Sequence, residues 1–177
     1  MLVIKDKPFN VFLSSEEINK AVEKVANQMN TDFEGKSPLF LIVLNGAFMF
    51  ASDLMKKITI SCELSFVKVS SYEGLSSTSN LKQLIGLVED VRGRTIVIIE
   101  DIIDTGITME GILNYLKPME PAAVKIATLL YKPEAFTKNY TIDYVGKEVP
   151  NKFLVGYGLD YDGEGRNLQD IYILDSK

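Results

Sequence analysis

The stretch 95-TIVIIEDIIDTGIT-108 decides the fold, because it joins an aliphatic run to acidic residues and a D-T-G turn. Residues 95–100 predict a buried strand, and Asp104–Thr108 predict a turn into a helix that ends before Pro118. A buried carboxylate is costly without a partner. We therefore expect Glu100 and Asp101 where the strand runs out, at a rim where a ligand binds, rather than inside the core.

Aliphatic strands and amphipathic helices alternate along the rest of the chain. Ser14 and Glu17 have capping-box spacing, and the apolar residues behind them recur at helical spacing. Further strands are expected over 39–44, 61–72, 81–91, 122–131 and within 149–160, with a helix over 47–58 and a loop over 73–80. This alternation indicates an α/β fold with a mostly parallel central sheet flanked by helices.

Length and composition fit one soluble globular domain over residues 1–177. Apolar residues make up 46% of the 177 residues and charged residues 24%. The first residues, MLVIKDKPFNVFL, hold charges that the apolar core of a signal peptide lacks, and no apolar run has the length of a transmembrane helix. We expect no membrane association and a cytoplasmic location.

The missing residue types exclude several kinds of chemistry. The chain has no histidine, and Cys62 is its only cysteine. Ser-His-Asp and Cys-His catalysis, internal disulfides and cysteine-based zinc sites are therefore excluded. A general base must be Asp, Glu, Lys or Tyr, and any metal should be a hard cation held by oxygen, such as Mg²⁺. The net charge of −5 argues against a nucleic-acid partner.

The D-T-G turn suits a phosphate. Free N–H groups and the positive dipole end at a helix start favour an anion, and Thr105 and Thr108 add hydroxyl donors. The acidic residues upstream could hold Mg²⁺ or sugar hydroxyls, so a sugar phosphate fits both halves of the segment. Two alternatives remain: a plain turn with Asp104 or Thr105 as the helix N-cap, and an aspartic protease, which would need two such aspartates in an all-β fold.

The segment VIIEDIIDTGIT, 97–108, resembles the phosphoribosyl pyrophosphate (PRPP) motif of type I phosphoribosyltransferases. The rest of the chain resembles the bacterial branch of the hypoxanthine-guanine phosphoribosyltransferase family, through LNGAFMF (44–50), SYEG (71–74), LLYKP (129–133), VPNKFLVGYGLDY (149–161) and RNL (166–168). This resemblance implies the type I phosphoribosyltransferase fold with a small hood and a flexible flap that begins at Ser71 and Tyr72.

The resemblance implies purine salvage, in which the phosphoribosyl group of PRPP passes to hypoxanthine or guanine and pyrophosphate leaves. It makes Asp104 the general acid/base at purine N7. It places Glu100 and Asp101 on the ribose hydroxyls and the Mg²⁺ shell, and Asp160 near the Mg²⁺ on the pyrophosphate side. The 5′-phosphate is cradled by Asp104, Thr105, Gly106, Ile107 and Thr108.

The same resemblance assigns the purine and pyrophosphate contacts. Lys132 donates to the C6 oxygen, which favours hypoxanthine and guanine over adenine. Phe153 stacks on the base, and Leu154 offers backbone groups to its edge. Arg166 contacts pyrophosphate. Without the resemblance, Lys132 and Arg166 are more typical of solvated surface charges, and Phe153 is more typical of a core residue.

One loop departs from the family pattern. Where the family often has Leu-Lys-Gly with a cis peptide and backbone N–H groups on pyrophosphate, this chain has Leu44-Asn45-Gly46. Asn45 keeps the backbone role and loses the charge, and at Ile107 some members have lysine. We expect modest PRPP affinity in consequence.

Other readings stay open at this stage. A xanthine-preferring transferase, a regulatory RNA-binding protein on the PRPP fold and a PRPP-sensing module without turnover all fit part of the pattern. Members of the family are usually dimers or tetramers, so a homodimer or homotetramer is expected.

Overall fold

The computed structural model describes residues 1–69 and 84–175, and it contains two sheets. The larger has the order β5-β4-β3-β6-β7-β8 and the smaller the order β1-β2-β10-β9. The strands are β1 Leu2–Ile4, β2 Lys7–Leu13, β3 Leu39–Leu44, β4 Glu63–Val69, β5 Leu84–Ile85, β6 Thr95–Ile103, β7 Ala123–Tyr131, β8 Tyr144–Glu148, β9 Leu154–Val155 and β10 Ile171–Leu174. The helices are α1 Ser15–Asp32, α2 Phe48–Met55, α3 Ile107–Leu116 and the short 3₁₀ helix η1 Lys117–Met119.

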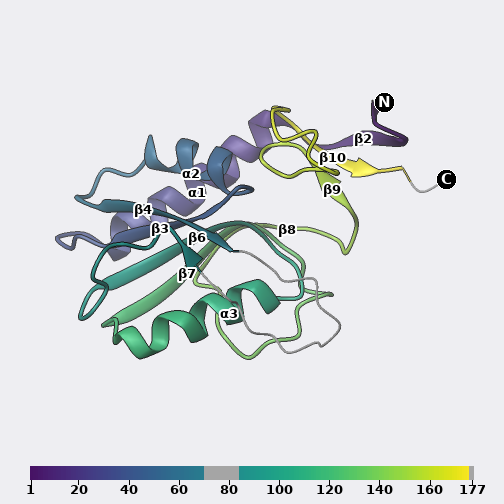
Figure 1. Cartoon of the computed structure of the whole chain (residues 1–177). Coiled ribbons are helices and arrows are strands. Elements are labelled where there is room, and N and C mark those ends of the chain that lie inside the picture. The colour runs from purple at the N-terminus through teal and green to yellow at the C-terminus, as the bar shows by residue number, and fades with distance from the viewer. Residues whose placement is uncertain (70–83, 176–177) are drawn as a thin grey trace, which may run out of the picture.

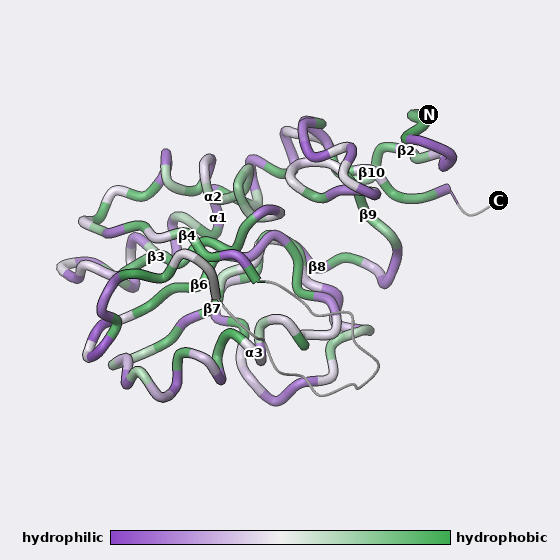
Figure 2. Tube along the Cα trace, in the orientation of Figure 1, coloured by the Kyte–Doolittle hydropathy of each residue, from purple (hydrophilic) through white to green (hydrophobic). Residues whose placement is uncertain are grey.

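The larger sheet confirms the expected α/β architecture. Strands β4, β3, β6, β7 and β8 are parallel to one another, and only β5 is antiparallel to its neighbour. Helices α1 and α2 cover one face and α3 covers the other (Figure 1). The central strands are hydrophobic along their length, while the turns between elements are hydrophilic (Figure 2). Coverage on both faces explains why these strands are continuous aliphatic runs.

Helix α1 begins at the predicted capping box. The N–H of Glu17 donates to Oγ of Ser14 at 3.3 Å, and the N–H of Ser14 donates to Oε2 of Glu17 at 3.0 Å. The buried face of the helix carries Ile18, Ala21, Val22, Val25, Ala26 and Met29. Local capping and packing against the sheet therefore agree on where this helix starts.

The smaller sheet forms the hood. We expected a buried strand within 149–160, and β9 is buried there, but it belongs to the hood rather than to the main sheet. The next parallel strand is β8, and the 149–160 segment gives only the two-residue strand β9, which pairs with β10 in the hood. Gly156 follows β9 with φ +102°, a left-handed conformation that ends the strand. The first and last strands of the described chain, β1 and β10, both lie in the hood (Figure 1).

Other boundaries are shorter than expected. Helix α2 ends at Met55 rather than at residue 58, and within the described residues the strand expected over 81–91 is limited to Leu84–Ile85. The flap residues Ser71 and Tyr72 lie outside the described residues. None of the described helices combines the length and apolarity that crossing a bilayer requires.

We predict that Ser14→Ala lowers the free energy of unfolding by about 1 kcal/mol, because the N–H of Glu17 loses its cap. Denaturant unfolding measures the change. Ser15→Ala is the control, since Ser15 is exposed at the next position and its side chain is not the cap. Equal destabilisation by both variants would contradict the capping role.

Candidate active site

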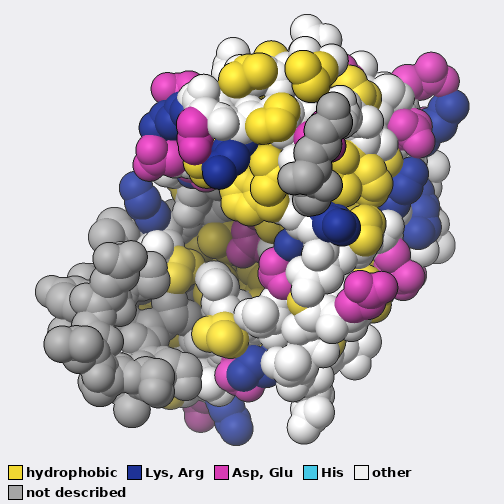
Figure 3. Space-filling view, turned by 90° about the vertical axis from the view of Figure 1, so that its right-hand side faces the viewer, with side chains coloured by type: hydrophobic (Ala, Val, Ile, Leu, Met, Phe, Trp, Pro, Cys, Tyr) yellow, Lys and Arg dark blue, Asp and Glu magenta, His cyan; other side chains and the backbone are white. Residues whose placement is uncertain are grey.

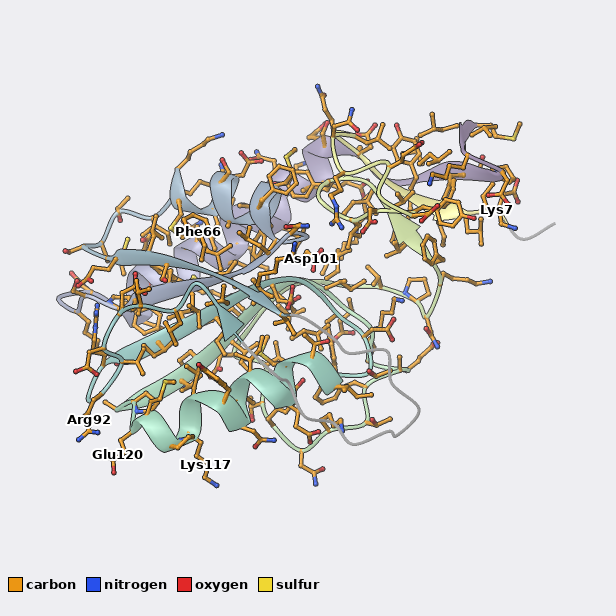
Figure 4. The ribbon with its side chains drawn as sticks, viewed as in Figure 1. Lys7, Phe66, Arg92, Asp101, Lys117 and Glu120 are labelled. Atoms are coloured by element: carbon orange, nitrogen blue, oxygen red, sulfur yellow. The ribbon has the colours of Figure 1, made fainter. Side chains whose placement is uncertain are left out.

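Glu100 and Asp101 lie inside strand β6, each 8% exposed. Our expectation that they project beyond the end of the strand is wrong, because β6 continues to Ile103. The strand pairs with β7 as far as Ile103, but its pairing with β3 stops at Ile99. The two acids therefore lie where β3 no longer pairs with β6, although β3 stays paired with β4 as far as Leu44. Asp101 lies between the main sheet and the hood (Figure 4).

Burial sets the charge of this pair. It raises the pKa of Glu100 well above its usual value, and the neighbouring Asp101 carboxylate raises it further. Burial also raises the pKa of Asp101, although the hydrogen bond that Oδ1 accepts from the N–H of Ile102, at 2.8 Å, opposes the shift. A proton, a cation or a network of sugar hydroxyls would each relieve the cost of two adjacent buried carboxylates.

The chain then enters the loop 104–108, which lines a cavity of about 240 Å³. The cavity is lined by Glu100, Ile102, Ile103, Asp104, Thr105, Gly106, Ile107, Thr108 and Met109. Gly106, with φ +82°, is the N-cap of α3, so the alternative of Asp104 or Thr105 as the cap is wrong. The first N–H groups of α3 have no intrahelical acceptor, as at every helix start. That of Ile107 donates only over 3.5 Å to Oγ1 of Thr105, a weak bond that an anion could replace.

Lys132 is buried against this loop rather than solvated. It is 7% exposed, and its Nζ lies 2.6 Å from Oδ2 of Asp104. Its backbone N–H donates to the carbonyl of Ile103 at 3.0 Å. The end of β7 thus places an ammonium group directly beside the carboxylate proposed for proton transfer.

The loop after β3 packs tightly on Asp101. A methyl group added at Gly46 would lie 1.8 Å from Oδ2 of Asp101, and one added at Gly158 would lie 2.1 Å from the carbonyl oxygen of Gly46. The peptide between Leu44 and Asn45 is cis, and Asn45 is exposed. The backbone at Gly158 in the hood therefore packs on the loop that follows β3, and that loop packs on Asp101. The surface is hollowed between the hood and the strand ends, with acidic side chains inside the hollow (Figure 3).

Arg166 is held in place by the hood. Its Nη2 lies 2.6 Å from Oδ1 of Asp160, and its Nη1 donates to the carbonyl of Gly158 at 2.7 Å. Among the described residues, no three carboxylate, thiol or imidazole side chains gather as a metal-binding group, so Asp160 does not join Glu100 and Asp101 in one cluster.

Phe153 is exposed rather than part of the core. It is 45% exposed, and its ring packs edge-on against Tyr161 at 5.7 Å and near Phe9 at 6.3 Å. Leu154 beside it is buried in β9. An aromatic ring fixed in this way leaves a surface open to a stacking partner.

The chain has known relatives. A family model described as a phosphoribosyl transferase domain matches residues 12–162. The hypoxanthine-guanine phosphoribosyltransferase of Streptococcus pneumoniae is 41% identical over 167 residues, which cover 93% of this chain and 92% of that protein. The chain belongs to the hypoxanthine-guanine phosphoribosyltransferase family.

Two further members of the family show how far the likeness extends. The hypoxanthine-guanine phosphoribosyltransferase of Aquifex aeolicus is 35% identical over 177 residues, 99% of each chain. The crystal structure of a hypoxanthine phosphoribosyltransferase from Staphylococcus aureus has a TM-score of 0.86 and 36% identity, covering 94% of this chain and 91% of that one. The expected type I phosphoribosyltransferase fold is confirmed, while the roles of individual residues stay predictions.

The contacts of the segment 132–140 were not predicted from the sequence pattern. Thr137, Lys138 and Tyr140 all bond to the loop 104–108 or to the first turn of α3. These residues lie in an irregular stretch between β7 and β8 without periodic pattern.

We predict that Glu100→Gln stabilises the ligand-free protein at pH 8. Because the folded-state pKa is raised, the folded chain binds more protons than the unfolded chain above the usual value of 4.5, and wild-type stability falls as the pH rises. A gain of about 1 kcal/mol would raise Tm by about 2–4 °C. Thermal unfolding at pH 5 and pH 8 measures the change. A variant no more stable than wild type at pH 8 would show that the buried charge is not destabilising.

Proposed function

We propose that this chain, as one phosphoribosyltransferase domain, transfers the 5-phosphoribosyl group of PRPP to hypoxanthine and guanine. The products are IMP or GMP and pyrophosphate, which is a reaction of purine salvage. The observation that carries the proposal is the ion pair between buried Lys132 and partly exposed Asp104 beside the cavity of the loop 104–108, in a chain of this family.

The ribose 5-phosphate half of PRPP fits the segment from β6 to α3. The N–H groups of residues 105–108 and the hydroxyls of Thr105 and Thr108 would hold the 5′-phosphate. Glu100 and Asp101 would accept hydrogen bonds from the ribose hydroxyls. Because the breaking C1–oxygen bond leaves positive charge on the ribose, these carboxylates would also stabilise the transition state.

The acidic pair fits Mg²⁺ as the cofactor. Mg²⁺ is commonly held by one or two carboxylates, with substrate phosphates and water as its other ligands, and two buried carboxylates with raised pKa values favour a cation. Asp160 would contribute from the pyrophosphate side. When bound, the ion would neutralise charge on the pyrophosphate leaving group.

The purine fits the Lys132–Asp104 pair. The N7 and O6 atoms of hypoxanthine and guanine lie on one edge of the base, so two neighbouring side chains can contact both. Lys132 would donate to O6 and Asp104 would exchange a proton with N7, while Phe153 would stack on the ring and Leu154 would offer backbone groups. Adenine presents a donor at C6, which Lys132 would repel.

Pyrophosphate fits the other end of the hollow. The N–H groups of Asn45 and Gly46 would bind it through the backbone, and Arg166 would contact it by charge. Asn45 supplies no charge, so modest PRPP affinity stays a prediction. The flap from Ser71 and Tyr72 and a homodimer or homotetramer stay predictions that rest on the family resemblance. A cytoplasmic location stays a prediction that rests on the sequence pattern.

The test is a spectrophotometric assay with PRPP and Mg²⁺, with hypoxanthine, guanine, xanthine and adenine offered separately. We expect turnover with hypoxanthine or guanine, none with adenine, and loss of turnover when a chelator removes Mg²⁺. Preferred use of xanthine would move the assignment to a xanthine-preferring transferase. No turnover in a folded protein that binds PRPP would favour a regulatory or sensing role.

We predict that Asp104→Asn lowers kcat by ~10²–10⁴ while the protein stays folded, because the amide cannot exchange the N7 proton. Steady-state kinetics measure the loss. Asp143→Asn is the matched control, since Asp143 forms a similar pair with Lys125 at 2.7 Å where β7 begins, far along the strand from the loop. Unchanged turnover in Asp104→Asn would remove this residue from the mechanism.

A further inference from the structure

The segment 132–140, which follows β7, lies along the outside of the loop 104–108. Thr137 donates to the carbonyl of Thr105 through both its N–H and its Oγ1, each at 3.4 Å. The hydroxyl of Tyr140 donates to the carbonyl of Gly106 at 2.8 Å. Nζ of Lys138 lies 2.7 Å from Oε2 of Glu110 in the first turn of α3. The loop is therefore bonded from behind, on the side away from its cavity.

Aromatic packing fixes Tyr140 in this position. Its ring meets Phe136 edge-on at 5.1 Å, and Phe136 in turn meets Tyr131, the last residue of β7, edge-on at 5.5 Å. A methyl group added at Gly106 would lie 2.6 Å from the Tyr140 hydroxyl oxygen and 2.7 Å from Cε2 of Phe136. Tyr140 thus packs against the loop 104–108, and its ring is held there by Phe136, which packs on Tyr131 at the end of strand β7.

The hydrogen bond from the Tyr140 hydroxyl holds the peptide between Gly106 and Ile107, two residues that line the cavity. The peptide between Gly106 and Ile107 is planar, so holding the Gly106 carbonyl in one direction aims the N–H of Ile107 in the opposite direction. That carbonyl also accepts the helical hydrogen bond from Glu110 at 3.0 Å. Two donors on one side therefore orient the N–H of Ile107, which lies at the start of α3, where an anion would bind in place of the weak 3.5 Å bond to Oγ1 of Thr105.

We propose that Tyr140 is a positioning residue for the phosphate-binding loop, and that its hydroxyl, with support from Thr137, sets the affinity for the 5-phosphate of PRPP. This inference rests on the proposed function of the loop 104–108. Tyr140 acts through the Gly106–Ile107 peptide and does not line the cavity. The purine side of the site depends on Lys132, whose pair with Asp104 is formed without the Tyr140 hydroxyl.

The experiment compares Tyr140→Phe with a matched control, Tyr144→Phe. Both hydroxyls are partly buried donors, and that of Tyr144 bonds to Oδ2 of Asp32 at 2.9 Å, between β8 and the end of α1. The measurements are the KM for PRPP, the KM for hypoxanthine, kcat, and the Kd of ribose 5-phosphate by calorimetry. Ribose 5-phosphate reports on the loop without any need for turnover.

We expect Tyr140→Phe to raise both the KM for PRPP and the Kd of ribose 5-phosphate about three- to tenfold, the usual effect of one lost hydrogen bond. The KM for hypoxanthine should change by less than about twofold. Thr137→Val should act in the same direction and more weakly, because its bonds are longer. Tyr144→Phe should lower thermal stability and leave both phosphate-dependent constants unchanged.

Three results would overturn the positioning role: an unchanged Kd of ribose 5-phosphate in Tyr140→Phe, an equal rise in the KM for hypoxanthine, or the same effect in Tyr144→Phe. Failure of the proposed function has a different signature. There the wild-type protein would bind ribose 5-phosphate but would transfer no phosphoribosyl group from PRPP to any purine, and the effect of Tyr140→Phe on that Kd would still decide the inference.

Discussion

The burial of two adjacent carboxylates is the constraint around which this structure is arranged. Glu100 and Asp101 lie within β6 at the point where β3 stops pairing with it, so the sheet opens there on one side. Their charge is unfavourable in the free protein and becomes favourable only with a cation or hydrogen-bond donors beside it. Gly46 leaves room for Asp101, and Gly158 leaves room for the backbone of Gly46. The cost of burying this pair is consistent with the proposed site for a cation and sugar hydroxyls.

Two segments remote in sequence complete the site from opposite sides. The hood contributes Arg166 and Phe153, each held by neighbours within the hood. The segment after β7 contributes Lys132 at its start and Tyr140 at its end, and contacts the loop 104–108 at both. One stretch of nine residues, 132–140, therefore carries both the proposed purine contact of Lys132 and the hydrogen bond by which Tyr140 positions the proposed phosphate-binding loop.

The main sheet was predictable because its strands β3, β6 and β7 are buried on both faces and read as aliphatic runs. Strand β8 was missed because its sequence, YVGKE, mixes charged residues and glycine with apolar ones. The hood was expected only from the family resemblance, because its strands β2 and β10 come from opposite ends of the chain. Glu100 and Asp101 were predicted to lie near a ligand, but their burial was not predicted. Their burial depends on where β3 stops pairing with β6, which the sequence around the acids does not encode. The contacts of Tyr140 depend on the path of an irregular loop, which local periodicity does not encode.

The central claim is tested most directly by a crystal structure of the protein with Mg²⁺, PRPP and a purine analogue that cannot react. We predict the 5-phosphate on the N–H groups of residues 105–108, the ribose hydroxyls at Glu100 and Asp101, and the base stacked on Phe153 with its C6 oxygen at Lys132. The Lys132–Asp104 pair should separate to admit the base. A phosphate bound elsewhere, or a base that leaves Lys132 paired with Asp104, would contradict the account.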